Sequence, residues 1–243
     1  MREDYWTGNL NLFPGAVVYY GKGGNTSWHQ HLAIQLVIAH EGTFKLQRDS
    51  ENTAKEETFA IIPPNQKHCL YSENPLFLLL IEPYGSFNER LLSDMSLAAL
   101  SALPSAITRR RSTQEIVNIL LRTGIPDRKN LSAPVLAALR YLDSYAPTPK
   151  ASLPEAAKKA HISPSYLTHR FSQEIGIPFR RYAIWVRLRC AVEAITKSNM
   201  RLSDAAARAG FSDGAHLSRL FRTNFGLSPS TLLRMHTDVN DWP

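Results

Sequence analysis

Residues 203–229 read SDAAARAGFSDGAHLSRLFRTNFGLSP, and this stretch decides the fold of the C-terminal half. Its first part is rich in alanine, which favours a short helix against which a second helix can pack closely. Ser203 or Asp204 is suited to open that helix, because either side-chain oxygen can accept a hydrogen bond from a free backbone N–H. Gly210 then predicts a tight turn at the end of the helix.

The second part of this stretch predicts another helix. Asp213 stands where it can cap the first turn. Leu217, Leu220 and Phe221 follow at helical spacing, so they share one apolar face. Gly226 ends the helix, since glycine readily adopts the left-handed conformation of a helix C-terminus. Two short helices joined by a tight turn form the helix-turn-helix arrangement.

The same pattern occurs 50 residues earlier in the chain. Within residues 152–178, His161 lies in the turn, and Ser163 followed by Pro164 is suited to start the second helix. We call these residues the first repeat and residues 203–229 the second repeat. The recurring features are Ala156-Ala157 as Ala206-Ala207, Leu167 as Leu217, Phe171 as Phe221, and Gly176 as Gly226.

The positive charge of the chain is concentrated in the half that holds the repeats. Residues 1–129 contain 13 basic and 13 acidic residues, whereas residues 130–243 contain 15 basic and 8 acidic residues. The whole net charge of +7 therefore belongs to the second half. Such asymmetry indicates a polyanionic partner, either nucleic acid or an anionic membrane surface.

Residues 130–240 resemble the paired helix-turn-helix domain of AraC/XylS-type transcription regulators. The resemblance implies two recognition helices that enter successive major grooves on one face of double-stranded DNA. A connecting helix over residues 179–196, about 25 Å long, suits a groove spacing of about 34 Å once flanking elements are added. The matching motifs are Gly210-Phe211-Ser212-Asp213, Leu217-Ser218-Arg219-Leu220-Phe221-Arg222, Phe225-Gly226, Ser228-Pro229 and, in the connecting helix, Arg187, Arg189 and Ala191.

The resemblance implies that exposed residues of the two recognition helices read base edges. Arg219 is the strongest candidate, because arginine bonds guanine bidentately. The alternative for the first repeat is that its polar residues are simply solvated. The predicted base-reading residues are Ser165, Tyr166, Thr168 and His169 in the first repeat and Ala215, His216 and Arg219 in the second.

A further group of residues is expected to contact phosphates. Such contacts set the position of a protein on the duplex rather than its sequence preference. The predicted phosphate-contacting residues are Ser163, Arg170, Arg180, Arg181, Arg187, Asp213 and Arg222.

Two residues of the first repeat depart from the family pattern. His161 stands where glycine is usual, which predicts a strained turn. Arg170 stands where an apolar residue is usual, and its side chain is expected to extend outward to a phosphate. We therefore expect the two repeats to contribute unequally to binding.

The first ninety residues predict β structure. Short runs rich in β-branched and aromatic residues alternate with turns that contain glycine and proline. Several short strands in succession are typical of a small barrel or sandwich. The predicted strands are residues 16–20, 33–39, 43–47, 58–62 and 76–81.

Residues 23–72 resemble the cupin barrel that many of these regulators carry as a sensor. The resemblance implies an interior site for a small-molecule effector. Gln35 replaces the usual glutamate ligand of the first cupin motif. The other matching residues are Gly23, His29, His31 and Gly42 in the first motif and Pro63 and His68 in the second, and the departures in the second motif are Glu57, Asn65 and Ser72.

Three histidines of this region are candidate metal ligands. His29 and His31 are two residues apart and, on a strand, point to the same face. If that face lines the barrel, His68 converges on them, and three imidazoles suit a divalent transition metal ion. The alternative is that these histidines and Gln35 act as hydrogen-bond partners or effector contacts, because the glutamate ligand is missing.

Two other classes of function are open to the N-terminal half. Many cupins are metal-dependent enzymes, but the incomplete ligand set and the attached helix-turn-helix repeats argue against catalysis. The sequence offers no recognisable Ser-His-Asp arrangement, phosphate-binding glycine loop or catalytic carboxylate pair, so we expect no enzymatic activity and no catalytic residues. A ligand-independent regulator, with the barrel as a dimerisation platform, is the third alternative.

Residues 84–129 predict a helical bridge between the two ends of the chain. Their leucines exceed what a lone helix on a small barrel needs, which favours a homodimer seam or, alternatively, packing against the outside of the barrel. The leucines concerned are Leu91, Leu92, Leu97 and Leu100.

The sequence thus predicts an α+β chain with a cupin-like barrel in residues 1–83, a bridge in residues 84–129 and a double helix-turn-helix domain in residues 130–243. Its expected function is effector-controlled activation of transcription, with DNA and RNA polymerase as partners. No apolar run approaches the roughly 20 residues of a membrane helix, and no apolar leader follows Met1, so a cytoplasmic protein with no membrane partner is expected.

Overall fold

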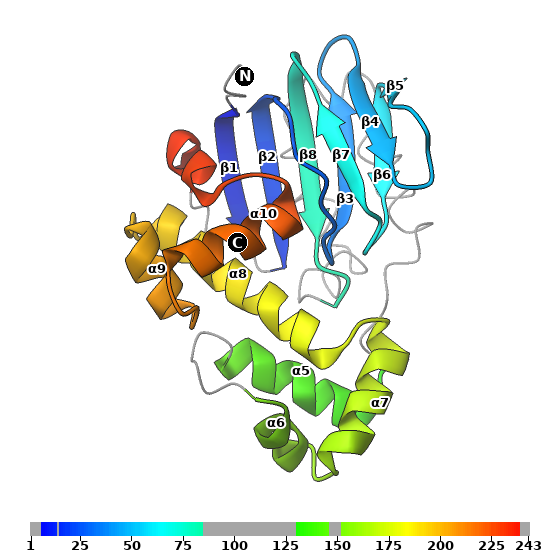
Figure 1. Cartoon of the computed structure of the whole chain (residues 1–243), viewed down its shortest axis with the longest axis vertical. Coiled ribbons are helices and arrows are strands. Elements are labelled where there is room, and N and C mark those ends of the chain that lie inside the picture. Colours follow the sequence, from blue (N-terminus) through cyan, green and yellow to red (C-terminus); the bar gives the residue numbers. More distant parts are fainter. Residues whose placement is uncertain (1–5, 14, 85–129, 146–151, 239–243) are drawn as a thin grey trace, which may run out of the picture. The chain divides into compact units, whose positions relative to one another are not determined.

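A computed structural model of the chain shows an α+β architecture (Figure 1). The structure describes residues 6–13, 15–84, 130–145 and 152–238. The chain divides into two compact units, which we call the β unit and the helical unit. The β unit holds the described residues of Met1–Asp127 and of Arg222–Pro243, and the helical unit those of Arg128–Phe221.

The β unit is built from short strands that come mostly from the N-terminal third of the chain. A last strand comes from the C-terminal end. The strands are β1 (Thr7–Phe13), β2 (Ala16–Lys22), β3 (Ile34–Ala39), β4 (Phe44–Arg48), β5 (Lys55–Glu57), β6 (Phe59–Ile62), β7 (His68–Tyr71), β8 (Pro75–Ile81) and β9 (His236–Asp238).

These strands form two sheets. The larger sheet has the order β6-β3-β8-β2-β1-β9 and the smaller one the order β5-β4-β7. Neighbouring strands are antiparallel except β1 and β9, which pair in parallel. In the part of the chain that the structure describes, the sheets stay separate, so the expected small barrel takes the form of two sheets rather than one closed barrel.

The core of the β unit lies on the strands at the centre of the larger sheet. All six residues of β3 are buried, as expected for a continuous apolar run in a central strand. Leu36 and Phe77 are fully buried and belong to one cluster with Leu79 and Ile81 of β8. Removal of this apolar surface from water stabilises the sheet on which the neighbouring loops are mounted.

The five predicted strands correspond to β2, β3, β4, β6 and β8, with ends within two residues of the prediction. The prediction missed the other four. β1 mixes glycine and asparagine with leucine, and β5 and β9 are only three residues long. Short polar strands of this kind depend on the neighbouring strand rather than on their own pattern.

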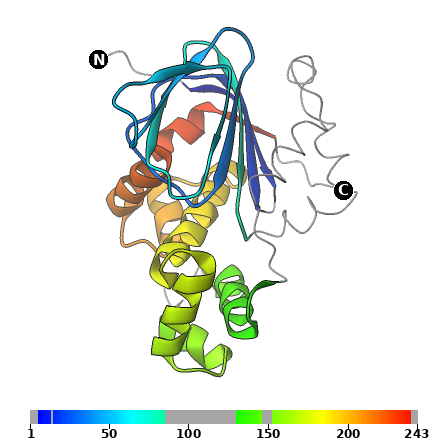
Figure 2. The same ribbon diagram turned by 90° about the vertical axis from the view of Figure 1, so that its right-hand side faces the viewer.

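The helical unit contains the first predicted repeat, the helix after it and the second repeat as far as Phe221. In Figures 1 and 2, α5 lies beside α6 and α7, and α8 runs on from α7. None of the described helices is long and apolar enough to cross a membrane. The helices are α5 (Ala133–Tyr145), α6 (Leu153–Lys159), α7 (Pro164–Ile175), α8 (Phe179–Lys197), α9 (Leu202–Arg208) and α10 (Gly214–Phe225). The last residues of α10 and the short 3-10 helix η2 (Pro229–Arg234) belong to the β unit.

The predicted connecting helix is confirmed as α8, one residue longer than expected. Phe171 of α7 is fully buried, and its ring packs edge-on against Phe179 and Tyr182 of α8, with centroids 5.4 and 5.7 Å apart. This aromatic cluster ties the first repeat to the start of α8. The predicted bridge of residues 84–129 lies outside the described residues.

Candidate functional site

The two repeats are equivalent in structure, but not at one constant sequence offset. In the first helices, buried Ala156 and Ala157 correspond to buried Ala205 and Ala206. The predicted match to Ala206 and Ala207 is wrong by one residue, because Ala207 is exposed. The second helices, α7 and α10, do keep the offset of 50. The turn of the second repeat is therefore one residue longer.

The tight turns confirm the strain predicted at His161. Its φ of 56° matches the φ of 76° at Gly210, and each backbone N–H donates to a carbonyl three residues back. Glycine takes this left-handed conformation freely, whereas a side chain makes it cost about 1–2 kcal/mol. His161 thus carries strain that Gly210 avoids.

The second helix of each repeat has a capped N-terminus. Ser163 Oγ accepts a hydrogen bond from the backbone N–H of Tyr166 at 3.2 Å, and Asp213 Oδ1 accepts one from His216 at 2.7 Å. The backbone N–H of His216, and then the Ser212 hydroxyl, lower the pKa of the Asp213 carboxyl. The predicted caps of α9 are wrong: Arg201 occupies the N-cap position, and Ser203 and Asp204 lie inside the helix.

The predicted base-reading residues lie on the second helices, turned away from the buried faces. Leu167 and Phe171 of α7 and Leu217 and Phe221 of α10 are buried. Tyr166 is 51% exposed, an unusual position for a large aromatic ring. Exposed with it are Ser165, Thr168, His169, Ala215 and Arg219, whereas His216 is half-buried.

Thr168 and His216 already have partners within their own repeat. The Thr168 hydroxyl donates to the carbonyl of Pro164 at 2.9 Å. His216 Nδ1 lies 3.0 Å from Ser212 Oγ, and its ring meets Phe211 edge-on. Base reading by either residue would have to compete with these contacts. Their roles in DNA recognition stay predictions.

Two predicted phosphate-contacting arginines also have structural contacts. Arg187 Nε donates to the carbonyl of Ala209 at 3.0 Å, and its guanidinium lies 4.5 Å from the centroid of the Phe211 ring. Arg170 forms an ion pair of 2.6 Å with Glu174 on the next turn of α7. The other members of the group are half-buried Arg181 and the exposed residues Ser163, Arg180, Asp213 and Arg222, and their contacts with phosphates stay predictions.

The pattern of side chains in the sequence does not predict the contacts around the second turn. Ser212, Phe211 and Arg187 together hold the turn and the start of α10. The extra residue in the second turn, Ser212, was the available signal. Alignment of the two repeats at a constant offset of 50 residues hides this insertion.

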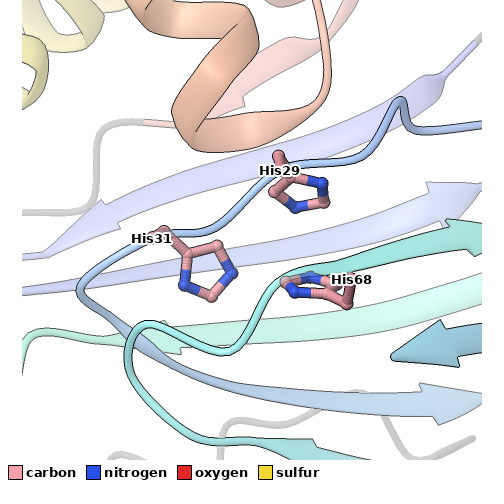
Figure 3. A group of neighbouring side chains, drawn as sticks. All are labelled: His29, His31 and His68. Carbon is pink, nitrogen blue, oxygen red and sulfur yellow. The ribbon is translucent and has the colours of Figure 1, made fainter. Parts of the chain in front are cut away.

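The three candidate histidines of the β unit converge, as predicted (Figure 3). Their rings are 4.1 to 5.6 Å apart between centroids, and each histidine is at most 5% exposed. The predicted reason was wrong, because His29 and His31 do not lie on a strand. They lie in the extended segment before β3, where His29 forms an isolated antiparallel bridge with His68.

One nitrogen of each imidazole is fixed by the backbone. His29, His31 and His68 place Nδ1 2.8–2.9 Å from the carbonyl oxygens of Ser27, Ala33 and Gln66, respectively. A neutral ring that donates from Nδ1 has its lone pair on Nε2. Among the described residues, His68 Nε2 is buried without a hydrogen-bond partner. His31 Nε2 lies 2.7 Å from Gln35 Oε1, an acceptor to which His31 donates when its proton is on Nε2.

Burial keeps these imidazoles neutral. It lowers the pKa of His29 to about 2 and that of His68 to about 4, and neighbouring imidazoles add to both shifts. Burial also lowers the pKa of His31. The cluster therefore offers uncharged nitrogen donors at neutral pH, the form in which histidine binds metal ions.

Comparison with known proteins agrees with this fold. Residues 156–235 match the family described as a helix-turn-helix domain. The urease operon transcriptional activator of Escherichia coli is 27% identical over 145 residues, 58% of this chain and 49% of that protein. The arabinose operon regulatory protein of Salmonella typhimurium is 23% identical over 238 residues, 92% of this chain and 73% of that protein.

A solved structure extends the likeness over nearly the whole chain. The structure of ToxT from Vibrio cholerae with a bound unsaturated fatty acid has a TM-score of 0.62 and 14% identity, and covers 99% of this chain and 100% of that chain. At such low identity the likeness shows a common fold. The chain spans about half the length of the urease operon activator.

Proposed function

Because this chain carries the paired helix-turn-helix domain of AraC/XylS-type regulators, we propose that it is a sequence-specific DNA-binding transcription activator controlled by a ligand in its β unit. The observation that carries the proposal is the structural repeat itself. Each repeat has a capped second helix with a buried apolar face and an opposite polar face. Activation is favoured because a relative is named an operon activator.

The experiment is fluorescence anisotropy of the full chain on DNA from upstream of its own gene. We expect sequence-preferring binding that weakens steeply as salt rises, since each neutralised phosphate releases counterions. Arg219→Ala should cost about 1–3 kcal/mol of binding free energy and relax the preference at one position of the site. Arg140→Ala removes an exposed charge of α5 outside the predicted DNA surface and serves as the matched control. Equal losses in both variants would refute base reading by Arg219.

For the ligand, we propose a divalent transition metal ion held by His29, His31 and His68. Support comes from the backbone bonds at Nδ1, since metal-binding histidines are commonly oriented by such a hydrogen bond. The unpartnered Nε2 of His68 supports it too, because buried polar atoms normally have partners. At His68 the ligand would replace a missing partner rather than break an existing one.

The present spacing of the cluster implies movement on binding. The ligand atoms lie within 4.8 Å of one another. Two nitrogens at about 2.1 Å from one ion are at most about 4.2 Å apart. An ion bound by all three imidazoles therefore needs every nitrogen pair within that shorter distance, and Gln35 has to release His31 Nε2.

The metal proposal is tested on untagged protein by elemental analysis and by Co²⁺ titration followed by absorption spectroscopy. His68→Ala should abolish stoichiometric binding, and His40→Ala, outside the cluster, should not. Gln35→Glu adds a carboxylate beside His31 and should tighten binding. Unchanged Co²⁺ affinity in His68→Ala would refute the site. A thermal-shift series with an unsaturated fatty acid tests the organic class of ligand suggested by ToxT.

The remaining partners follow from the same proposal. An activator of transcription works with RNA polymerase in the cytoplasm, and homodimerisation would bring two copies to one promoter. We propose the domain limits given by the sequence, namely 1–83, 84–129 and 130–243. The relatives are transcription regulators, so the proposal includes no catalytic step.

A further inference from the structure

The histidine cluster brings no negative charge to a bound metal ion (Figure 3). Among the described residues, the group that can surround one ion consists of His29, His31 and His68 and includes no carboxylate. Gln35, whose Oε1 lies 2.7 Å from His31 Nε2, carries a neutral amide. A divalent ion in the cluster would therefore bring two positive charges that none of these side chains offsets.

A positively charged side chain lies on the strand beside the cluster. Arg48 of β4 pairs directly with His68 of β7 across the smaller sheet, so both side chains lie on the same face. Burial is the largest cause that lowers the pKa of His68, and the charges of His31 and Arg48 lower it further. The guanidinium of Arg48 is thus close enough to disfavour additional positive charge at His68.

The carboxylates next to Arg48 are already paired. Arg48 Nη1 donates to Glu57 Oε1 at 2.8 Å and to Glu51 Oε1 at 3.4 Å. Lys55 Nζ donates to the same oxygen of Glu51 at 2.7 Å. The two cations and two anions of this network balance one another. The network therefore supplies no surplus negative charge to offset a metal ion.

A buried double charge without a counter-charge is unfavourable. Each histidine of the cluster is at most 5% exposed, so little water reaches the site. Charges in such surroundings are normally paired with an opposite charge, because the loss of hydration is otherwise not repaid. A tetrahedral ion held by three protein ligands keeps a fourth position open. An anion from solution can occupy that position and supply the missing charge.

We propose that the histidine cluster binds its metal ion together with a small carboxylate anion, which occupies the fourth coordination position. This inference rests on the metal ion of the proposed function and names a second component of the same ligand. A carboxylate oxygen is an ordinary ligand of such ions. Once Gln35 has released His31, its amide NH₂ is a donor for the second carboxylate oxygen. The β unit then responds to the ion and the anion in combination.

The test follows the visible absorption of Co²⁺ during titration of the untagged full chain, with acetate as the probe anion. The solutions contain no other carboxylate and no halide, and nitrate keeps the ionic strength constant. Co²⁺ affinity should rise about tenfold when acetate is present at about ten times its own dissociation constant. The absorption bands should change as well, because the ion gains a ligand. Equal affinity and an unchanged spectrum with and without acetate would overturn the proposal.

Two variants place the same carboxylate on opposite faces of the chain's sheets. Gln35→Glu supplies the anion from within the cluster, so Co²⁺ should bind tightly without acetate, and acetate should add nothing further. Gln47→Glu is the matched control, because Gln47 precedes Arg48 on β4 and its side chain lies on the face away from the cluster. Its dependence on acetate should equal that of the unmodified chain. If acetate tightens Co²⁺ binding equally in both variants, the charge argument is overturned.

The remaining outcomes separate the anion from the metal site. The first measurement uses the unmodified chain, so it decides the proposal even if a variant fails to fold. Tight Co²⁺ binding without acetate leaves the metal site in place and removes only the anion. No Co²⁺ binding under any condition, with Gln35→Glu included, refutes the metal site and the anion together. An acetate effect that survives in His68→Ala would show that it arises outside the cluster.

Discussion

In the first helix-turn-helix repeat the second helix is secured within the helical unit, whereas in the second repeat the helix end is secured to the β unit. Glu174 near the end of α7 pairs with Arg170 and accepts the backbone N–H of Ser132 at 2.8 Å, just before α5. Gly226 after α10 instead bonds to Ser27. The difference teaches that two copies of one motif can be tied to different surroundings by a few residues at their helix ends.

The repeats also differ in the quality of their turns. The first repeat has strained His161, and the second has relaxed Gly210 with the additional Ser212. The repeat with the better turn also carries Arg219, the strongest candidate for base reading. The following three changes test how far the repeats are distinct, beginning with the largest expected effect.

Phe171→Ala should lower the free energy of unfolding by about 3–5 kcal/mol, because it empties a closely packed aromatic site. Urea unfolding followed by far-ultraviolet circular dichroism measures the loss. Tyr166→Ala, on the exposed side of the same helix, should stay within about 0.5 kcal/mol of the unmodified chain. A small loss in Phe171→Ala would show that α7 does not depend on its contacts with α8.

His161→Gly should raise the free energy of unfolding by about 0.5–1 kcal/mol. Relief of left-handed strain, about 1–2 kcal/mol, is partly offset by the greater freedom of glycine in the unfolded chain. Gly210→Ala should be destabilising for the converse reason. Differential scanning calorimetry should show an increase of about 2–4 °C per kcal/mol for a chain of this size.

A matched control exists for this substitution. Asn199 also has a positive φ, of 48°, but asparagine tolerates that conformation. Asn199→Gly should therefore change the melting temperature less than His161→Gly does. If the two variants shift it equally, His161 carries no particular strain.

Arg170→Ala should have the smallest effect, at most about 1 kcal/mol, because its ion pair with Glu174 is partly exposed. Glu174→Ala should cost more, since it also removes the acceptor of the Ser132 N–H. Glu174→Gln keeps an acceptor and should fall between the two. Chemical denaturation of the three variants gives this order, and a larger loss for Arg170→Ala than for Glu174→Ala would contradict it.

The parts of the fold that the sequence predicted were those with their own local pattern. The apolar runs around Leu36 and Phe77 identified the central strands, and the caps Ser163 and Asp213 were found in their expected roles. Strand β9 could not be predicted, because its pairing depends on β1, more than two hundred residues away. Its own three residues carry no strand pattern.

In the candidate sites, too, the sequence predicted only the residues that have a recognisable local pattern. His29, His31 and His68 were recognised by residue type and spacing, although His29 reaches its place through a bridge with His68 rather than through a strand. The bond from Ser27 to Gly226 left no signal in the sequence, since Gly226 is already explained as a helix stop. Contacts made by the backbone of one segment on another are invisible to side-chain patterns.

The additional residue in the second turn sets a rule for building hybrid proteins from this chain. A transplant of α10 in place of α7 keeps its frame if the junction falls at the caps, where Ser163 corresponds to Asp213. A junction placed inside the first helices has to follow the correspondence of those helices, in which Ala156 matches Ala205. If a junction inside the first helices used the correspondence of the caps instead, the grafted helix would be shifted by one residue. It would then be rotated by about 100°, and its buried alanines would come to the surface.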